Sequence, residues 1–360
     1  MIGGIAGAVA IILFVTAHEA GHFVAAKATG MKATEFFFGF GPKLWSTRKG
    51  ETEYGFKALP FGGYVRIVGM NPLEEVAPED MGRTYREKKF WEKSVVVLAG
   101  VGMNFLIGFL LFYGVVLANG MPGEPTSTVA TVVPDSPAAE AGIRQGDTIT
   151  AIAGTPVTDW EDIPETLRRI GPEETTVTIS RDGEPVTLSV DLDKSDTITG
   201  SGFLGVGPTA SIEAVGPIEG VGIAGRLVGD GVVDTFRTLY QMFRPSSLAE
   251  YFGVLAGDTD VPDEIRPVSP IGIANIGSQA ESVGFFLGIL AYVNVILATI
   301  NLLPLFPLDG GHFAVALYEK ITGRQADVRR LMPIAAAVIG VFAFLGFVAV
   351  ILDVANPINL

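Results

Sequence analysis

The sequence predicts an α-helical polytopic membrane protein with about four transmembrane helices and an inserted β-rich domain. Three observations predict this fold class. The 360 residues have a mean hydropathy of +0.42 and are 48% hydrophobic, values that are unusual for a soluble enzyme. Four segments are long and apolar enough to cross a hydrocarbon core of about 30 Å. A long acidic stretch between the second and third segments contains the alternating pattern of β-strands.

Composition excludes several classes of site and partner. The chain has no cysteine, which excludes disulfides and thiolate metal ligands. Its net charge of −14 argues against a nucleic-acid partner, because phosphate binding needs a basic face. The first apolar segment lacks a basic leader and a small-residue cleavage site, so we expect a retained span and not a signal peptide.

The charges of the connecting loops predict the orientation of the spans. The candidate spans cover residues 2–26, 94–118, 283–303 and 333–352. Residues 32–93 hold eleven Lys and Arg against nine Asp and Glu, and the connection 306–332 is also rich in Lys and Arg. Residues 120–200 hold five Lys and Arg against fifteen Asp and Glu. Because Lys and Arg mark the cytoplasmic side, we expect the two basic loops inside and the acidic domain outside.

The chain divides into seven predicted regions. The outer domain shows short strands, with a hairpin signal at Asp182-Gly183. Apolar residues at helical spacing over 227–243 predict an amphipathic helix. The regions are a first transmembrane helix (1–30), a cytoplasmic or re-entrant loop (31–93), a second transmembrane helix (94–119), the β-rich domain (124–208), an amphipathic helix with a linker (209–280), a third transmembrane helix (281–319) and a fourth (331–353).

Two histidines and a glutamate interrupt the first span, in the sequence HEAGH. His18 and His22 are four residues apart, so on a helix both imidazoles project from one face and can hold one zinc ion. Glu19 can reach a water molecule at the metal without binding the metal itself. Ionisable side chains within a span are costly unless they are paired or bind a metal, and they usually serve function. The sequence therefore predicts a zinc site inside the first span.

A catalytic zinc site takes three protein ligands and leaves one position open. Without cysteine, the third ligand must be His, Asp or Glu. Asp309 and His312 both follow the third span, in the sequence NLLPLFPLDGGH. At about 1.5 Å per residue, His18 lies about 22 Å into the membrane from the outside, near the depth at which the third span ends. The residues alone leave Asp309 and His312 as alternatives for the third ligand.

Prolines interrupt the chain at the end of the third span. Pro304 and Pro307 break the helix, and the backbone groups that they free must be buried in protein or line a wet cavity. Asn301 would face the same place. Its amide could hold a substrate backbone or an oxyanion, or make an ordinary hydrogen bond between helices, and the residues alone do not separate these roles.

Further motifs extend along nearly the whole chain. They are FGFGP (38–42), KALPFGGYVRIVGM (57–70), AGVGMNF (99–105) and SPIGIA (269–274). With HEAGH and NLLPLFPLDGGH, the chain resembles the site-2 proteases, which are membrane-embedded zinc metalloproteases. It is most similar to the bacterial regulator-of-sigma-E protease group with one PDZ domain. One departure is Val101, where the family often has proline.

The resemblance implies a role for each residue of the metal site. His18 and His22 would be zinc ligands and Glu19 the catalytic base. The aspartate of the family's LDG motif is the third ligand, so the resemblance favours Asp309 and makes His312 a neighbour.

The resemblance also implies a substrate-binding set. Asn301 and Pro304 match the family's N-x-x-P, which is thought to help hold the substrate strand. Gly39, Phe40 and Gly41 would belong to a membrane-associated, re-entrant β-loop that pairs with an unwound substrate.

The outer domain resembles a circularly permuted PDZ domain of β-rich α+β type, inserted on the extracytoplasmic side. Phe203, Leu204 and Gly205 resemble the loop and strand that bind a peptide C-terminus in such domains. The alternative is that the domain acts as a size filter and binds no peptide.

The resemblance thus implies an intramembrane zinc metalloendopeptidase in a bacterial cell membrane, with its active site toward the cytoplasm. Its expected substrates are single-span proteins such as anti-sigma factors or remnant signal peptides. The alternatives are a membrane metal or ion transporter, because buried His, Glu and Asp also mark ion pathways, and an inactive scaffold that uses its PDZ domain.

Overall fold

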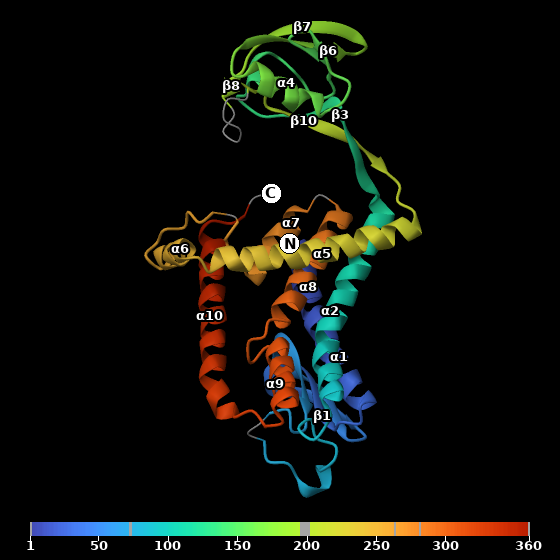
Figure 1. The fold of residues 1–360 in the computed structure, drawn as a ribbon, viewed down its shortest axis with the longest axis vertical. Helices are drawn as coiled ribbons and strands as arrows, with labels where there is room; N and C mark the ends of the chain where they lie inside the picture. Colours follow the sequence, from blue (N-terminus) through green and yellow to red (C-terminus); the bar gives the residue numbers. More distant parts are fainter. Residues whose placement is uncertain (1, 72–73, 195–201, 263, 281, 359–360) are drawn as a thin grey trace. The chain divides into compact units, whose positions relative to one another are not determined.

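The computed structural model describes residues 2–71, 74–194, 202–262, 264–280 and 282–358 (Figure 1). The small remainder of the predicted regions, including residues 195–201 of the predicted PDZ domain, lies outside the described residues. The chain forms two compact units. The first joins Met1–Ala118 with Pro217–Leu360, and the second is Asn119–Gly216.

Within the described residues, four helices of the first unit are long and apolar enough to cross a membrane. They are α1 (Ile2–Ala28), α2 (Phe90–Asn119), α8 (Val283–Asn301) and α10 (Val328–Ala355). These four candidate spans fit the predicted polytopic helical membrane protein.

Helices α1 and α2 approach each other closely at two glycines. A Cβ atom on Gly21 would lie 2.5 Å from the carbonyl oxygen of Ala99, and one on Gly100 would lie 2.4 Å from Nε2 of His22. Small residues let the backbones of membrane helices come into contact. This contact brings the histidine-bearing face of α1 directly against α2.

Strands β1 (Ala33–Lys49) and β2 (Thr52–Ile67) form a sheet that packs against α1. Phe36 pairs with both Val65 and Tyr54, so the first half of β1 lies between the two halves of β2. No further strand of the described chain pairs with this sheet, and the end of β2 around Val65 therefore has one edge without a strand partner.

The third span ends at a break over residues 302–308, after which helix α9 (Asp309–Thr322) begins. Pro304 and Pro307 lie in this break, as their missing N–H groups and fixed φ predict. A Cβ atom on Gly310 would lie 2.1 Å from a carbonyl oxygen of the break. The glycine therefore lets the start of α9 fold back tightly onto the end of α8.

The first unit also contains helices that surround the spans. They are η1 (Pro78–Asp80), α5 (Pro217–Met242), α6 (Pro245–Leu255) and α7 (Pro270–Gln279). Helix α5 lies across α2 and α8 (Figure 1), and its apolar face packs on them through Ala224, Leu227, Val228 and Val232. Helix α5 begins ten residues before the predicted amphipathic segment. The sequence did not indicate this earlier start, because glycines interrupt the apolar periodicity there.

A buried ion pair joins the end of α10 to the segment before α7. Nη2 of Arg266 lies 3.2 Å from Oδ1 of Asp353, and the two side chains are 4% and 0% exposed. The backbone N–H of Ser269 donates to Oδ2 of Asp353 at 2.7 Å. This contact fixes the C-terminal end of α10, whose apolar side chains there pack on Tyr251 of α6.

The second unit is a β-rich domain with two short helices. Its antiparallel sheet has the order β10-β3-β4-β6-β7, and β5 pairs with β4. The Asp182-Gly183 hairpin predicted from the sequence connects β6 and β7, with both residues at positive φ. The elements are β3 (Met121–Val132), α3 (Pro137–Glu140), β4 (Thr148–Ile152), β5 (Thr155–Pro156), α4 (Asp162–Ile170), β6 (Glu174–Arg181), β7 (Glu184–Asp191), β8 (Asp193–Lys194), β9 (Gly202–Phe203) and β10 (Val206–Glu213).

Candidate metal centre

Three ligand atoms converge where α1 meets the start of α9. Nε2 of His18 lies 3.0 Å from Oδ2 of Asp309, and Nε2 of His22 lies 3.3 Å from the same oxygen. The two histidine Nε2 atoms are 3.1 Å apart. Of the two candidates for the third ligand, Asp309 lies with the histidines and His312 does not.

The spacing of these atoms fits a zinc ion. Ligands at about 2.0 Å from tetrahedral zinc are about 3.3 Å apart, close to all three measured separations. Oδ2 of Asp309 is buried and has no hydrogen-bond donor among the described residues. Two imidazole lone pairs and a carboxylate oxygen repel one another unless a cation lies between them, so the donor set suits a divalent metal.

The imidazole of His22 is oriented by the backbone of α2. Its Nδ1 lies 2.7 Å from the carbonyl oxygen of Val96, which fixes the proton on Nδ1 and leaves the Nε2 lone pair toward the cluster. Nδ1 of His18 is buried without a hydrogen-bond partner among the described residues. The close contact of α1 and α2 at Gly21 and Gly100 therefore positions His22, through the backbone carbonyl of Val96.

Glu19 lies beside the three ligands but is held by the sheet. Its Oε2 accepts a hydrogen bond from the backbone N–H of Val65 at 3.0 Å. The residue that sequence analysis did not single out here is Val65, although it lies within the motif at 57–70. Because the N–H comes from the unpaired edge of β2, the sheet holds the carboxylate of Glu19 without losing a ladder hydrogen bond.

The three ligands and Glu19 line a cavity of about 330 Å³. Asn301 lines it, as expected from its place before the prolines, and so do Asn104 and His312. Pro304 lies outside its walls. Gly39, Phe40 and Gly41 do not line it either. They form a bend of β1 opposite Leu59, with the ring of Phe40 against Gly62.

Two buried asparagines connect α2 with α8 next to this cavity. Nδ2 of Asn294 donates to the backbone carbonyl of Asn104 at 2.7 Å, and the residues are 0% and 2% exposed. Sequence analysis did not single out Asn294. Its signal was available, because an amide in the middle of an apolar span is expected to bond to a neighbouring helix.

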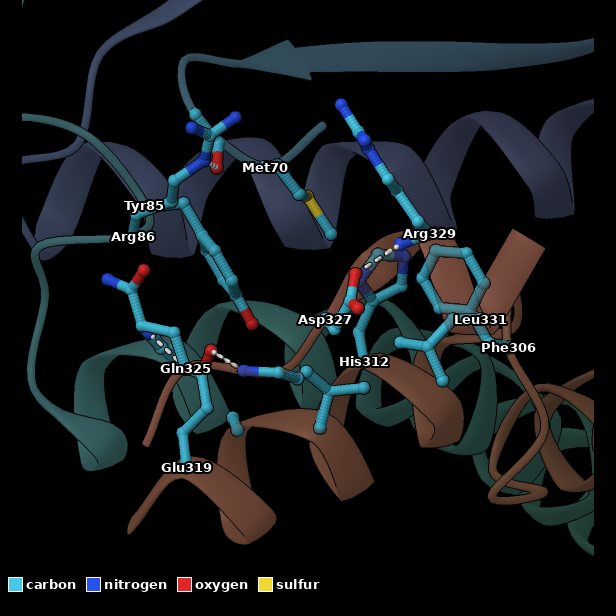
Figure 2. Close-up of a pocket in the computed structure, with 15 residues that line it drawn as sticks. Met70, Tyr85, Arg86, Phe306, His312, Glu319, Gln325, Asp327, Arg329 and Leu331 are labelled. Atoms are coloured by element: carbon cyan, nitrogen blue, oxygen red, sulfur yellow. Dashed lines mark hydrogen bonds and ion pairs between the residues drawn. The ribbon is translucent and has the colours of Figure 1, made fainter. Parts of the chain in front are cut away.

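A second cavity of about 350 Å³ adjoins the first (Figure 2). Met70 and His312 line both cavities. Tyr85, Glu319 and Arg329 line this second cavity and come from different parts of the first unit; Figure 2 labels all three.

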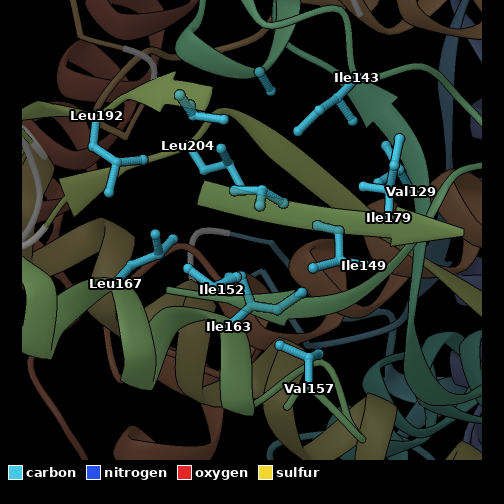
Figure 3. Close-up of a cluster of buried hydrophobic side chains, with 13 residues drawn as sticks. Val129, Ile143, Ile149, Ile152, Val157, Ile163, Leu167, Ile179, Leu192 and Leu204 are labelled. Atoms are coloured by element: carbon cyan, nitrogen blue, oxygen red, sulfur yellow. The ribbon is translucent and has the colours of Figure 1, made fainter. Parts of the chain in front are cut away.

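The predicted peptide-binding residues of the second unit differ in exposure. Leu204 is 1% exposed and belongs to the hydrophobic core of the unit (Figure 3). Phe203 is 38% exposed, and Gly205 has a φ of +82° and packs against Ser136. Among the described residues, the backbone N–H groups of Leu204 and Gly205 donate no hydrogen bond.

Comparison with known proteins gives a consistent result. A family model described as "Peptidase family M50" matches residues 6–346. Zinc metalloprotease Rip1 of Mycolicibacterium smegmatis is 34% identical over 406 residues, which cover 100% of this chain and 98% of that protein. Rip1 of Mycobacterium tuberculosis is 34% identical over 399 residues, covering 98% and 97%. A putative zinc metalloprotease of Rhizobium meliloti is 30% identical over 345 residues, covering 87% and 86%.

Proposed function

The chain belongs to peptidase family M50 and is a zinc metalloprotease, and we propose that it hydrolyses peptide bonds of single-span membrane proteins within the bilayer. The observation that carries this proposal is the convergence of His18, His22 and Asp309 beside Glu19, with both histidines inside an apolar helix that is long enough to cross a membrane. Ionisable side chains within a membrane span are costly to bury and are usually retained for a functional reason.

His18, His22 and Asp309 would hold the zinc ion, and Asn104 and Asn301 would line the space for the substrate. Zinc bound there supplies a Lewis acid that polarises a carbonyl group and lowers the pKa of a water molecule to about 7.

Glu19 acts as general base in this proposal. Its carboxylate accepts the proton of the attacking water and passes it to the nitrogen of the leaving amine. The hydrogen bond from Val65 keeps one carboxylate oxygen occupied, so the other is available for the proton. The amide of Asn301 is placed to donate to the substrate backbone or to the developing oxyanion.

The unpaired edge of β2 serves as the substrate platform. A transmembrane helix hides its peptide bonds in internal hydrogen bonds, so it must unwind before one carbonyl can react. An extended substrate segment can regain backbone hydrogen bonds by adding to the edge around Val65, which lines the metal cavity. Gly39, Phe40, Gly41 and Pro304 then act indirectly, by shaping the bent sheet and the helix break.

For the second unit we propose a PDZ-like domain over residues 124–208 that captures a peptide C-terminus. The N–H groups of Leu204 and Gly205, which donate to no described residue, support a carboxylate-binding role for this loop, and the half-exposed Phe203 would contact the peptide. The side chain of Leu204 would support the loop from the core. Unchanged cleavage rates after substitution of Phe203, with faster cleavage after removal of the domain, would favour a size filter instead.

The loop charges support an assignment of sides. We place the basic loops 32–93 and 306–332 in the cytoplasm of a bacterial cell and the acidic domain outside. The active site then opens toward the cytoplasm. Anti-sigma factors and remnant signal peptides are suitable substrates, because each offers one span and a fragment to be released.

The direct test is co-expression of the chain with a library of tagged single-span proteins, in comparison with the Glu19→Gln variant. We expect wild type to release fragments, and the variant to release none while it keeps about one zinc per chain. Cleavage that survives in the Glu19→Gln variant would remove the mechanism, and zinc flux into liposomes without cleavage would favour a transporter.

A further inference from the structure

The second cavity is built from elements that meet behind the metal cavity. Tyr85 and Arg86 come from the segment before α2, Lys93 from α2 itself, Glu319 from α9 and Arg329 from the start of α10. Met70 and His312, both labelled in Figure 2, line this cavity and the metal cavity. The two cavities are therefore neighbours that share these two side chains.

The charge left uncompensated in this cavity is positive. Five ionisable side chains other than histidine and tyrosine line it: Arg86, Lys93, Glu319, Asp327 and Arg329. Each acid already has a basic partner. Oε2 of Glu319 lies 2.8 Å from Nζ of Lys93, and Oδ2 of Asp327 lies 3.3 Å from Nε of Arg330, a residue outside this cavity. The cavity thus suits an anion.

The two remaining cations lack an acidic partner inside the cavity. Arg86 donates to the backbone carbonyls of Gly69, Asn71 and Glu74, which carry no net charge. The guanidinium of Arg329 makes no hydrogen bond or ion pair within the described part of the chain. Arg329 is therefore the side chain with free donors for a planar anion.

A buried hydroxyl in the same wall also lacks a partner. Tyr85 is 8% exposed, and its Oη atom is buried without a hydrogen bond to any described residue. Burial, together with the nearby charge of Glu319, raises the pKa of Tyr85, so its hydroxyl stays a neutral donor. Leaving such a group unpaired is unfavourable, and an acceptor bound in the cavity would satisfy it.

The proposed reaction creates one such acceptor. Hydrolysis of a peptide bond adds water across the C–N bond. The carbonyl carbon keeps the water oxygen and becomes a carboxylate, and the nitrogen takes the proton and leaves as an amine. The amine is a cation at neutral pH, so only the carboxylate matches the charge of the cavity.

We propose that the second cavity is a product site that receives the new C-terminal carboxylate after cleavage, with Arg329 pairing to it and Tyr85 donating a hydrogen bond. This inference rests on the proposed peptidase function. It makes Arg329 and Tyr85 positioning residues for product release, distinct from the zinc ligands and from Glu19.

The test uses the full-length, zinc-loaded Glu19→Gln protein, which binds peptide without cleaving it. The probes are the acetylated peptide Ala-Leu-Ala-Leu as free acid and as amide, and the quantity measured is the ratio of their dissociation constants. We expect the acid to bind more tightly. Added Arg329→Gln should reduce this preference about tenfold, as expected for the loss of one charge-assisted contact, and Tyr85→Phe should reduce it by a smaller factor.

The chain supplies a matched control in Arg324→Gln, which removes the same charge from a nearby side chain that lies outside the cavity and has no acidic partner among the described residues. It should leave the acid preference unchanged. An unchanged preference in the Arg329→Gln protein would mean that zinc alone holds the carboxylate, and would overturn the proposal. An equal loss in the Arg324→Gln protein would also overturn it.

The cleavage test and the binding test together separate this inference from the proposed function. If wild type and the Glu19→Gln variant release the same fragments from tagged substrates, the peptidase proposal fails whatever the binding ratios are. If cleavage depends on Glu19 but the acid preference does not depend on Arg329, only the product-site proposal fails.

Discussion

The backbone N–H of Val65 donates a hydrogen bond to the carboxylate of Glu19 at 3.0 Å, so the edge of a β-strand holds the proposed general base. One backbone group therefore links the sheet, the first membrane helix and the metal cavity. The arrangement predicts that this N–H matters more than the side chain of Val65.

Replacement of Val65 by proline removes the N–H and keeps an extended backbone, which proline tolerates at a strand edge. We expect the cleavage rate to fall roughly tenfold or more, the loss expected for one hydrogen bond to a charged group. Val65→Ala keeps the N–H and should retain most activity. Equal rates for the two variants, measured on one tagged substrate, would contradict the proposed role of the N–H.

The zinc content of alanine variants should identify the third ligand. Asp309→Ala removes one of three converging donors, so we expect its zinc content to fall far below one ion per chain. His312→Ala should keep about one ion, because His312 lines the cavity without joining the cluster. Metal analysis of the purified proteins measures both, and the opposite result would exchange the roles of these two residues.

Addition of a methyl group at the α1–α2 contact should disturb the metal site. In Gly100→Ala the new Cβ atom would meet Nε2 of His22 at 2.4 Å, so the helices or the imidazole must shift. We expect a loss of about 1–3 kcal/mol in stability and a reduced zinc content. Gly102→Ala is the control, since its added Cβ would meet no described atom within 4 Å beyond the neighbouring backbone of its own helix. Thermal unfolding that shifts equally in both variants would argue against a tight crossing.

The buried Arg266–Asp353 pair should show strong coupling. Asp353→Ala leaves a buried guanidinium without its carboxylate, and we expect a loss of about 3–5 kcal/mol in stability. The double replacement Arg266→Met with Asp353→Leu removes both charges and should recover much of that loss. Thermal unfolding of the single and double variants completes the cycle, and additive effects would rule out a coupled pair.

Acid should weaken the second unit through Asp147. The guanidinium of Arg181, which donates to both carboxylate oxygens at 2.8 and 2.7 Å, holds the pKa of Asp147 below its usual range. Because the native pKa is lowered, the stabilisation is complete above the unfolded pKa of about 3.9 and is lost as pH falls through the native value. Hydrogen exchange across this unit should show the wild-type advantage over Asp147→Asn shrinking below about pH 4. The exposed Asp191→Asn variant is the control, and an advantage that persists undiminished at low pH would contradict this account.

The parts of the structure that follow from local spacing could be predicted from the sequence. Four apolar segments predict four membrane helices, and the spacing of His18 and His22 predicts two imidazoles on one face of α1. The third ligand could not be derived in this way. Asp309 and His312 lie one helical turn apart, and only the tight return at Gly310 determines which side chain meets the histidines.

Long-range pairing explains what the sequence pattern did not indicate. Nothing in the alternation of β1 shows that Phe36 will pair with two segments of β2, and that placement decides which edge remains open beside Glu19. The same pairing places Gly39, Phe40 and Gly41, which were expected in a β-loop that pairs with substrate, at a bend of β1 outside the metal cavity. The connection from Asn294 to Asn104 likewise depends on which faces of α2 and α8 meet.

The edge of β2 around Val65, which no described strand pairs with, also bears on how a cleavage position would be chosen. A strand added there is held by its main chain, which is the same for every residue type except proline. The peptide bond that lies at the metal would then depend on the register in which the segment pairs with the edge. Such an enzyme would measure distance from the membrane surface more than it reads side chains, and unrelated substrates could be cut at comparable depths.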